Sequence, residues 1–262
     1  MKFKTIEMTE EGTIAIVRLN RPSHYNALDG TMAGELLTAA QFIERSPNLR
    51  AMVLTANGPA FCGGGDVKAF VNAGDKVPEF VASVVTPFHQ FITQLMRMEK
   101  PSVAAINGVA AGGGFSLAMA CDLVVAQEGA SFTSAYSRIG ATPDGGLSYV
   151  LPRLIGTRRT LELYLTNRIL TATEALEWGL VNLVVPANKL LDEAHKIAGM
   201  LAEGPTLAFS RARDLIYRSM DHNFERQLEL EAGSIIDSSR TDDFRIATRS
   251  FVEKVEPSYV GR

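Results

Sequence analysis

The chain has 262 residues, 46% of them hydrophobic and 21% charged, with a formal net charge of −3 at pH 7. This suits one large domain, or a core with an appended helical segment. No basic run exceeds Arg158-Arg159 and no apolar run reaches about 18 residues, so neither nucleic acid nor a membrane is an expected partner. The start, MKFKTIEMTE, lacks the apolar segment of a signal peptide, and the chain has two cysteines, so we expect a cytoplasmic protein. None of the four histidines has metal-ligand spacing with another His or Cys, so we expect no metal site.

The first third of the chain predicts strands and helices in alternation. Residues 12–20 (GTIAIVRLN) alternate polar and apolar side chains, which is typical of a strand, and residues 49–55 predict a second strand. Between them, Asp29 is a good N-cap for a helix through about Glu44. The glycine-rich loop at residues 57–66 (NGPAFCGGGD) follows the second strand. This alternation favours an α/β fold with a largely parallel sheet.

The middle of the chain combines glycines with one acidic turn. A variable segment at residues 72–85 precedes an expected helix at 86–98. A buried-type strand at 102–106 then leads to the triple glycine at 112–114 and a short apolar helix. A further strand follows, and then a loop that ends in the turn PDGG at residues 143–146.

The last third of the chain is mostly helical. Segments 158–165 and 173–178 look helical, Gly179 suits the residue after a helix, and residues 180–185 predict a final strand. Amphipathic patterns then predict four helices, at residues 188–202, 205–218, 224–239 and 242–253. We therefore expect a core over residues 1–200 and a helical region over 201–262.

The two glycine runs, at residues 63–65 and 112–114, each follow an expected strand. Glycine lets backbone N–H groups approach a ligand closely. An anion hole with one N–H from each run explains both runs about as well as two tight turns do. Neither run has the GxGxxG spacing of a dinucleotide site, and no Gly-Lys-Ser/Thr of a Walker loop occurs.

Asp144, in the PDGG turn, has two interpretations. From the residues alone, a turn and a cap for a helix from Gly145 are favoured, because Asp is common at both. A carboxylate near donors for a negative charge is also a suitable catalytic base. The aromatic residues Phe132 and Tyr136 are typical of a core, and His89 is typical of a surface or core histidine on a helix.

Together, these residues resemble the crotonase family, the enoyl-CoA hydratase/isomerase superfamily. The matching segments run along nearly the whole chain: LNRPSHYNAL, AFCGGGD, KPSVAAINGVAAGGGFSLAMACDLVVA, ASF to PRLIG, WGLVNLVV and FVEK. The resemblance implies a ClpP-like α/β fold of repeated ββα units with a C-terminal helical region that forms trimers, often paired into hexamers. It also implies an acyl-CoA thioester as substrate, with coenzyme A as part of the substrate and no separate cofactor.

The resemblance assigns roles to individual residues. The N–H groups of Gly65 and Gly113 would form the oxyanion hole that holds the thioester oxygen as it becomes an enolate. Lys254 would reach the CoA of a neighbouring subunit. The remaining residues expected to contact CoA or the acyl group are His24, Ala27, Ala60, Cys62, Gly63, Phe132 and Tyr136.

The chain departs from the family's hydratases at both of their glutamate positions, where it has Ser116 and Tyr136. Neither side chain is a carboxylate base. Asp144 instead matches an acid used by isomerase branches, and the pattern resembles the bacterial enoyl-CoA isomerases of aromatic degradation. We therefore expect a Δ3–Δ2 enoyl-CoA isomerase with Asp144 as its single base.

Three alternatives stay open. The chain also resembles arylacyl-CoA dehalogenases, in which an aspartate attacks the ring and a histidine activates water. Asp144 and His89, twelve residues before Pro101, match those positions. An enoyl-CoA hydratase with water held by Ser116, and a non-catalytic acyl-CoA-binding relative, are the other two.

Overall fold

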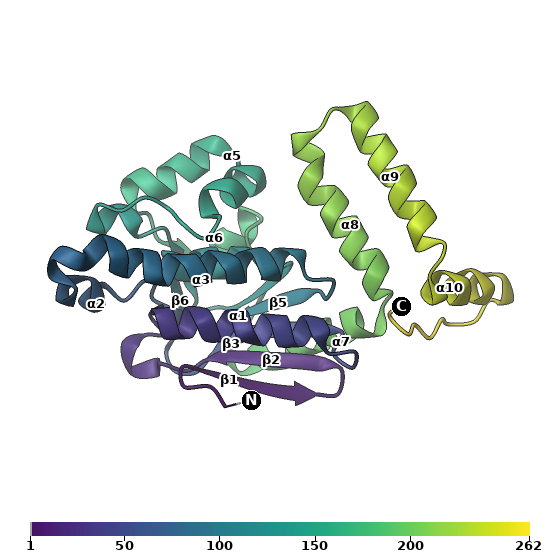
Figure 1. Ribbon diagram of the computed structural model, residues 1–262, viewed down its shortest axis with the longest axis horizontal. Coiled ribbons are helices and arrows are strands. Elements are labelled where there is room, and N and C mark those ends of the chain that lie inside the picture. Colours follow the sequence, from purple (N-terminus) through teal and green to yellow (C-terminus); the bar gives the residue numbers. More distant parts are fainter. Residues whose placement is uncertain (1) are drawn as a thin grey trace.

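The structure is a computed structural model that describes residues 2–262 (Figure 1). It contains a large sheet in the order β1-β2-β3-β5-β7-β10 and a small sheet in the order β4-β6-β8-β9. Only β1 with β2 and β8 with β9 pair antiparallel in these two sheets of residues 2–262. The strands are β1 (Ile6–Glu11), β2 (Ile14–Leu19), β3 (Ala51–Ala56), β4 (Ala60–Cys62), β5 (Ser102–Ile106), β6 (Val109–Ala111), β7 (Leu123–Gln127), β8 (Ser131–Thr133), β9 (Leu170–Thr171) and β10 (Leu183–Val185).

The expected ββα repeat is present. In the pairs β3/β4, β5/β6 and β7/β8, the first strand joins the large sheet and the second joins the small one. A helical segment follows each pair. The helices are α1 (Gly30–Arg45), α2 (Val67–Asn72), α3 (Val77–Arg97), α4 (Gly113–Met119), α5 (Leu147–Thr166), α6 (Ala172–Glu177), α7 (Leu190–Glu203), α8 (Thr206–Arg218), α9 (Phe224–Ser238) and α10 (Asp242–Glu253).

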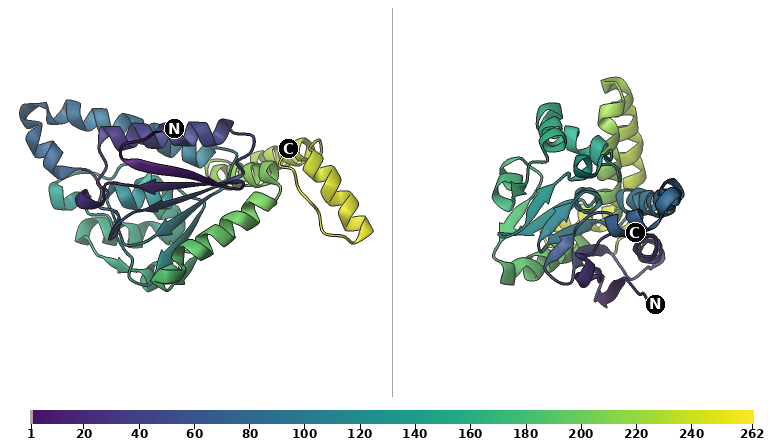
Figure 2. Two further views of the ribbon diagram at one scale, coloured as in Figure 1. Left: turned by 90° about the horizontal axis from the view of Figure 1, so that it is seen from below. Right: turned by 90° about the vertical axis from the view of Figure 1, so that its left-hand side faces the viewer.

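Both faces of the large sheet are covered by helices. In the fully buried strand β3, Met52 and Leu54 belong to the same apolar cluster as the inner face of α1 and the side chains of α3. Ala51 and Val53 alternate with them and pack with α7 instead. Figure 2 shows α7 on the opposite side of the sheet from α1. Such double coverage is the expected environment of parallel strands, and it explains why β3 and β5 are apolar along nearly their whole length.

Three expected elements have different bounds. The helix expected at residues 86–98 begins at Val77, so most of the segment taken as variable is helical. Pro78 lies in its first turn, where a missing N–H is tolerated, and Pro87 is accommodated inside it. The helix expected from Gly145 begins at Leu147, and non-helical backbone at Gly156 separates it from the helical segment that continues to Thr166 within α5. The final strand is shorter than expected, at Leu183–Val185.

The last three helices, α8 to α10, extend away from the sheets (Figure 1). Arg213 of α8 ties this arm to the core, because its guanidinium donates to Asp122 Oδ2 at 2.9 Å and to the carbonyl of Met98. Arg50 of the core in turn donates to the carbonyls of Gly204 and Tyr259. Between residues 2 and 262, no helix combines the length and hydropathy that a bilayer crossing requires.

Candidate active site

The two glycine runs meet at the ends of neighbouring strands of the small sheet. β4 pairs parallel with β6, and the runs 63–65 and 112–114 begin directly after them. Gly64 has a φ of +99°, and a Cβ built on it would lie 3.0 Å from the Ala111 carbonyl oxygen and 3.7 Å from Gly112 Cα. A side chain there would therefore push the two loops apart, so glycine is required for their close approach.

Gly65 and Gly113 each present an N–H that forms no hydrogen bond with any group in residues 2–262. Gly65 is held beside Leu28, whose N–H donates to the Gly64 carbonyl at 2.7 Å and whose carbonyl accepts from the Asp66 N–H at 3.0 Å. Gly113 is buried, and a Cβ on it would lie 2.8 Å from Leu28 Cδ1. Buried N–H groups are nearly always paired, so an unpaired one is a candidate for binding a ligand oxygen.

Asp144 does not cap α5. The helix begins at Leu147, and its N-cap is Gly146, which has no side chain to donate or accept. Gly145 and Gly146 have φ values of +58° and +80°, so a left-handed turn separates Asp144 from the first helical residue. The cap interpretation, favoured by the residues alone, is wrong, and the carboxylate is available for other contacts.

The loop that carries Asp144 packs tightly against α3 and α4. A Cβ on Gly145 would lie 2.7 Å from both the Phe88 ring and Ser116 Cβ. Ser116 also donates to the Asp144 carbonyl at 2.9 Å. Because α4 begins at Gly113, the same short helix carries the unpaired N–H and the serine that contacts the Asp144 loop.

The Asp144 carboxylate is part of a hydrogen-bonded chain. The Tyr136 hydroxyl donates to Asp144 Oδ1 at 2.5 Å, and the Ser116 hydroxyl lies 2.9 Å from the Tyr136 oxygen. Burial, the Asp144 charge and the hydrogen bond to Asp144 raise the pKa of Tyr136. The phenol therefore remains a proton donor to the carboxylate. The two positions at which hydratases carry glutamate thus support Asp144 here.

His89, on α3, is close to the same carboxylate. Its Nε2 lies 3.7 Å from Asp144 Oδ2 and accepts a hydrogen bond from the Gly145 N–H at 3.0 Å. In a neutral imidazole only one nitrogen carries a proton. Since Nε2 is the acceptor, the proton is assigned to Nδ1. The sequence offered only the spacing of His89 from Pro101 as a signal for this contact.

The segments expected to hold CoA lie next to each other. The Gly63 N–H donates to the Tyr25 carbonyl at 2.8 Å, and the Asn26 side chain donates to the Ala60 carbonyl at 2.8 Å. His24 is exposed beside them, with its Nδ1 3.0 Å from Ser23 Oγ. Residues 24–27 thus pack against the segment 60–65, of which 60–62 are the buried strand β4, next to the oxyanion donors.

Three other expected contact residues lie in distinct settings. Cys62 is fully buried, and burial raises the pKa of its thiol to about 12, so it is no nucleophile. Phe132 is also buried, with its ring centroid 5.7 Å from that of Phe115. Lys254 ends α10, at the opposite end of the molecule from α2 (Figure 1). Within one chain it is therefore remote from the glycine runs.

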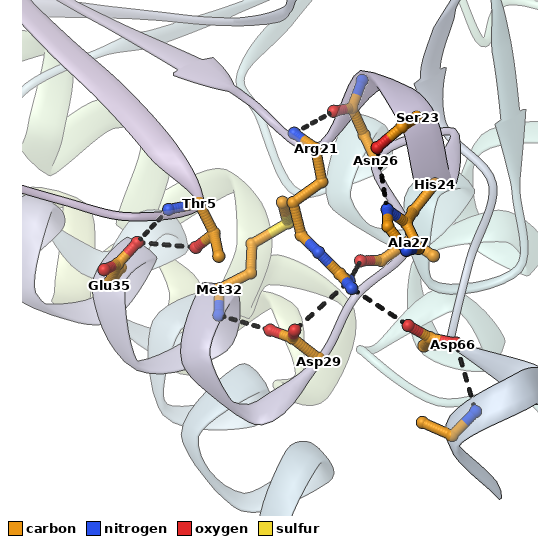
Figure 3. Close-up of polar contacts among 11 residues, drawn as sticks. Thr5, Arg21, Ser23, His24, Asn26, Ala27, Asp29, Met32, Glu35 and Asp66 are labelled. Atoms are coloured by element: carbon orange, nitrogen blue, oxygen red, sulfur yellow. Dashed lines mark hydrogen bonds and ion pairs between the residues drawn. The ribbon is translucent and has the colours of Figure 1, made fainter.

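Arg21 is a residue that the sequence reasoning missed. Its guanidinium contacts Asp29 and Asp66, which cap α1 and α2 (Figure 3). The matching segment LNRPSHYNAL contains Arg21, but a sequence does not show which partners a charged loop residue will find. The described residues, 2–262, contain no group of three His, Cys, Asp or Glu side chains arranged to hold a metal ion.

Comparison with known proteins shows which family the chain resembles. A family model described as enoyl-CoA hydratase/isomerase matches residues 9–262. The chain is 32% identical to 1,2-epoxyphenylacetyl-CoA isomerase of Escherichia coli K12, over 97% of each protein. It is 36% identical to 4-chlorobenzoyl coenzyme A dehalogenase-1 of an Arthrobacter species, over 86% of this chain and 82% of that one.

Solved structures support the same assignment. An enoyl-CoA hydratase from Polaromonas sp. JS666 superposes with a TM-score of 0.93 at 32% identity, covering 97% of this chain and 99% of that one. The enoyl-CoA hydratase from Bacillus anthracis gives a TM-score of 0.92 at 31% identity, covering 99% and 100%. The expected crotonase fold is thereby confirmed. The chain belongs to the enoyl-CoA hydratase/isomerase family of acyl-CoA enzymes.

Proposed function

We propose that this enzyme is a Δ3–Δ2 enoyl-CoA isomerase and that Asp144 is its single base. In this reaction the carboxylate removes a proton from the α-carbon of a 3-enoyl thioester, and the electron pair moves to the thioester oxygen. The resulting dienolate is then protonated at the γ-carbon by the same carboxylic acid. The double bond moves by one position, and no atom is gained or lost.

The oxygen that gains charge needs donors, and the N–H groups of Gly65 and Gly113 supply them. Each such donor commonly lowers the barrier by about 3 kcal/mol. Both groups are unpaired in the described chain, residues 2–262, and both follow strands of the small sheet. They are therefore free to bind the thioester oxygen without breaking an existing hydrogen bond.

The observation that carries the proposal is that Ser116 and Tyr136, at the two hydratase glutamate positions, both contact Asp144, which is a carboxylate. Hydration requires groups that activate and orient a water molecule. Here Ser116 and Tyr136 hydrogen bond to the Asp144 loop instead. One carboxylate is sufficient for a proton transfer between two carbons of one substrate.

The test is Asp144→Asn with a 3-enoyl-CoA substrate. The amide oxygen keeps an acceptor for the Tyr136 hydroxyl, so the loop retains its main contact, but the base is lost. We expect isomerisation to fall by about 10²- to 10⁴-fold. Asp192→Asn, at an exposed carboxylate of α7, is the matched control and should keep full activity. Undiminished turnover of Asp144→Asn would refute the role of Asp144 as the base.

An arylacyl-CoA dehalogenase or hydrolase is a second candidate, because His89 lies beside Asp144 and because the Arthrobacter relative is named as a dehalogenase. In that reaction the carboxylate attacks the ring carbon, the halide leaves, and water hydrolyses the aryl ester. A histidine that activates water needs a free lone pair. The lone pair of His89 Nε2 already accepts the Gly145 N–H, which favours the isomerase.

Isotope labelling separates the two candidates. The enzyme would be incubated with a halogenated arylacyl-CoA in ¹⁸O-labelled water for a single turnover, and the peptide that contains Asp144 would be analysed by mass spectrometry. Label in the Asp144 carboxylate would establish covalent catalysis. We expect none, together with exchange of solvent deuterium into the α-carbon of a 3-enoyl-CoA substrate.

A further inference from the structure

The loop that carries Gly65 rests on a partly buried cluster of charges centred on Arg21 (Figure 3). Arg21 follows β2 by two residues, and its side chain is 15% exposed. Its Nη1 donates to the Ala27 carbonyl at 2.5 Å and lies 3.3 Å from Asp29 Oδ2. Its Nη2 donates to Asp66 Oδ2 at 3.1 Å. One guanidinium therefore joins the segment that follows β2 to residues 27–29 and to Asp66.

Each aspartate of this cluster also fixes the start of a helix. Asp29 Oδ1 accepts the Met32 N–H at 2.8 Å and caps α1. Asp66 Oδ1 accepts the Ala69 N–H at 3.2 Å and caps α2. In both residues the second carboxylate oxygen faces Arg21. The guanidinium thus sets the positions of two helix starts relative to each other.

The bridge between Leu28 and Gly65 lies between these two caps. Leu28 directly precedes Asp29, and Gly65 directly precedes Asp66, so both residues of the bridge are bonded to residues that Arg21 holds. The bridge uses the Gly64 carbonyl and the Asp66 N–H and leaves the Gly65 N–H out. The direction of that N–H therefore depends on where Asp66 is anchored.

The charge and the shape of the site require an arginine at position 21 rather than another cation. Two carboxylates face one cation, and without it they would repel each other in a partly buried site. Burial raises the pKa of Asp66, but the hydrogen bonds from Arg21 and Ala69 and the Arg21 charge outweigh burial and lower it. Lysine has the charge but lacks the planar fork that serves three acceptors at once.

We propose that Arg21 is a positioning residue of the reaction, which holds the Gly65 N–H in line with the thioester oxygen through Asp66. Arg21 is not itself a ligand for CoA phosphates, because its side chain is only 15% exposed and is engaged by three internal acceptors. The inference rests on the proposed function, since it gives the Gly65 N–H the role of an oxyanion donor.

The sharpest variant is Asp66→Asn. Asparagine caps helices as well as aspartate does, so α2 keeps its cap through the amide oxygen. The amide nitrogen then faces the guanidinium, and the link to Arg21 is lost. Arg21→Met removes the link from the other side. Arg18→Met is the matched control, because Arg18 lies on β2, just before Arg21, and among residues 2–262 its guanidinium hydrogen bonds only to Thr9.

The readout is the ultraviolet absorbance of bound cinnamoyl-CoA, a conjugated thioester whose absorption moves to longer wavelength when its carbonyl is polarised. We expect a red shift with the unaltered enzyme and with Arg18→Met, and a clearly smaller one with Asp66→Asn and Arg21→Met. Isomerase kcat should fall by about 10- to 100-fold in both variants, while the dissociation constant of CoA changes by less than about threefold.

The outcomes distinguish failure of the oxyanion role of Gly65 from failure of the positioning role of Arg21. No red shift with the unaltered enzyme would refute the oxyanion role of Gly65 and hence the proposed function. A red shift that Asp66→Asn leaves unchanged, with unchanged kcat, would overturn the role of Arg21 alone. A parallel loss of kcat and of CoA binding would also overturn it, because that result indicates general damage to the loop. If Arg21→Met does not fold, Asp66→Asn still decides the matter, since it keeps both the cap and the arginine.

Discussion

At the residue scale, the bond between the Tyr136 hydroxyl and Asp144 Oδ1 decides how Asp144 behaves as a base. A donated hydrogen bond stabilises a carboxylate relative to the neutral acid. We therefore predict that Tyr136→Phe lowers isomerase kcat/KM about tenfold at neutral pH, because the carboxylate is no longer held in position.

Steady-state kcat and KM with a 3-enoyl-CoA substrate check this prediction. Ser116→Ala serves as the comparison, because it leaves the bond between tyrosine and aspartate in place, and its kcat/KM should fall less. Full kcat/KM in Tyr136→Phe would contradict the prediction and would mean that the hydroxyl only fills space beside Asp144.

The sequence was informative about single residues where a local motif fixes the backbone. Asp29 is the cap that it was expected to be. At Asp144 local reasoning failed, because two glycines in left-handed conformation delay the helix and turn the carboxylate toward Tyr136. The contacts of His89 and Arg21 are set by the packing of segments distant in the chain, and no local pattern encodes such contacts.

At the element scale, Glu35 of α1 holds the start of the chain against the core. Its two carboxylate oxygens accept from the N–H groups of Lys4 and Thr5 at 2.8 Å. One of them also accepts from the Thr5 hydroxyl at 2.6 Å, and Figure 3 shows both contacts with Thr5. Burial raises the pKa of Glu35, but these hydrogen bonds outweigh burial and lower it below 4.5. The folded state therefore favours the charged form.

We predict that Glu35→Gln lowers the free energy of unfolding by about 1 kcal/mol at pH 7, a value reduced for the partial exposure of the group. Because the pKa is lower in the folded state, this stabilisation is complete above pH 4.5 and is lost as the pH falls through the folded pKa. Urea unfolding at pH 7 and near pH 3 measures it. A difference between the two proteins that did not shrink at low pH would contradict the prediction.

The helices and the strands β2, β3, β5, β7 and β10 could be predicted from the sequence, because most of them have a buried face or a clear start or end, whereas β1 and the short strands of the small sheet were not predicted. The strands β3 and β5 are buried on both faces, and α1 has a side-chain cap. The helix α3, which contains Pro87, was predicted too short, because residues 72–85 were taken as a variable segment. Packing against α1 retains the helix across this proline, and such packing is not visible in the sequence.

At the scale of the whole molecule, the arm of α8 to α10 carries many exposed apolar side chains. They include Ile216, Phe224, Leu228, Ile235, Ile236, Phe251 and Val252. A single chain leaves them in water, and a large exposed apolar surface is typical of an interface. The resemblance to trimeric relatives gave the same expectation for residues 201–262. We therefore propose that this arm joins subunits.

We predict a particle with three times the 28.4 kDa mass of one chain, or twice that for a paired trimer, by light scattering after gel filtration. The double change Ile235→Asp and Phe251→Asp should give smaller particles, because it places carboxylates in the apolar surface. Leu191→Asp, at an exposed apolar position of α7, is the control and should leave the mass unchanged. A monomer in the unaltered protein would contradict the proposal.

The assembly also bears on the active site, because Lys254 is remote from the glycine runs of its own chain. If Lys254 binds the CoA of a neighbour, Lys254→Ala should raise KM for acyl-CoA by about tenfold and leave kcat nearly unchanged, as expected for the loss of one charged contact far from the reacting carbons. The dissociated variant of the arm should show the same increase in KM even though it keeps its lysine. Equal KM values for the dissociated and the assembled protein would place the whole CoA site within one chain.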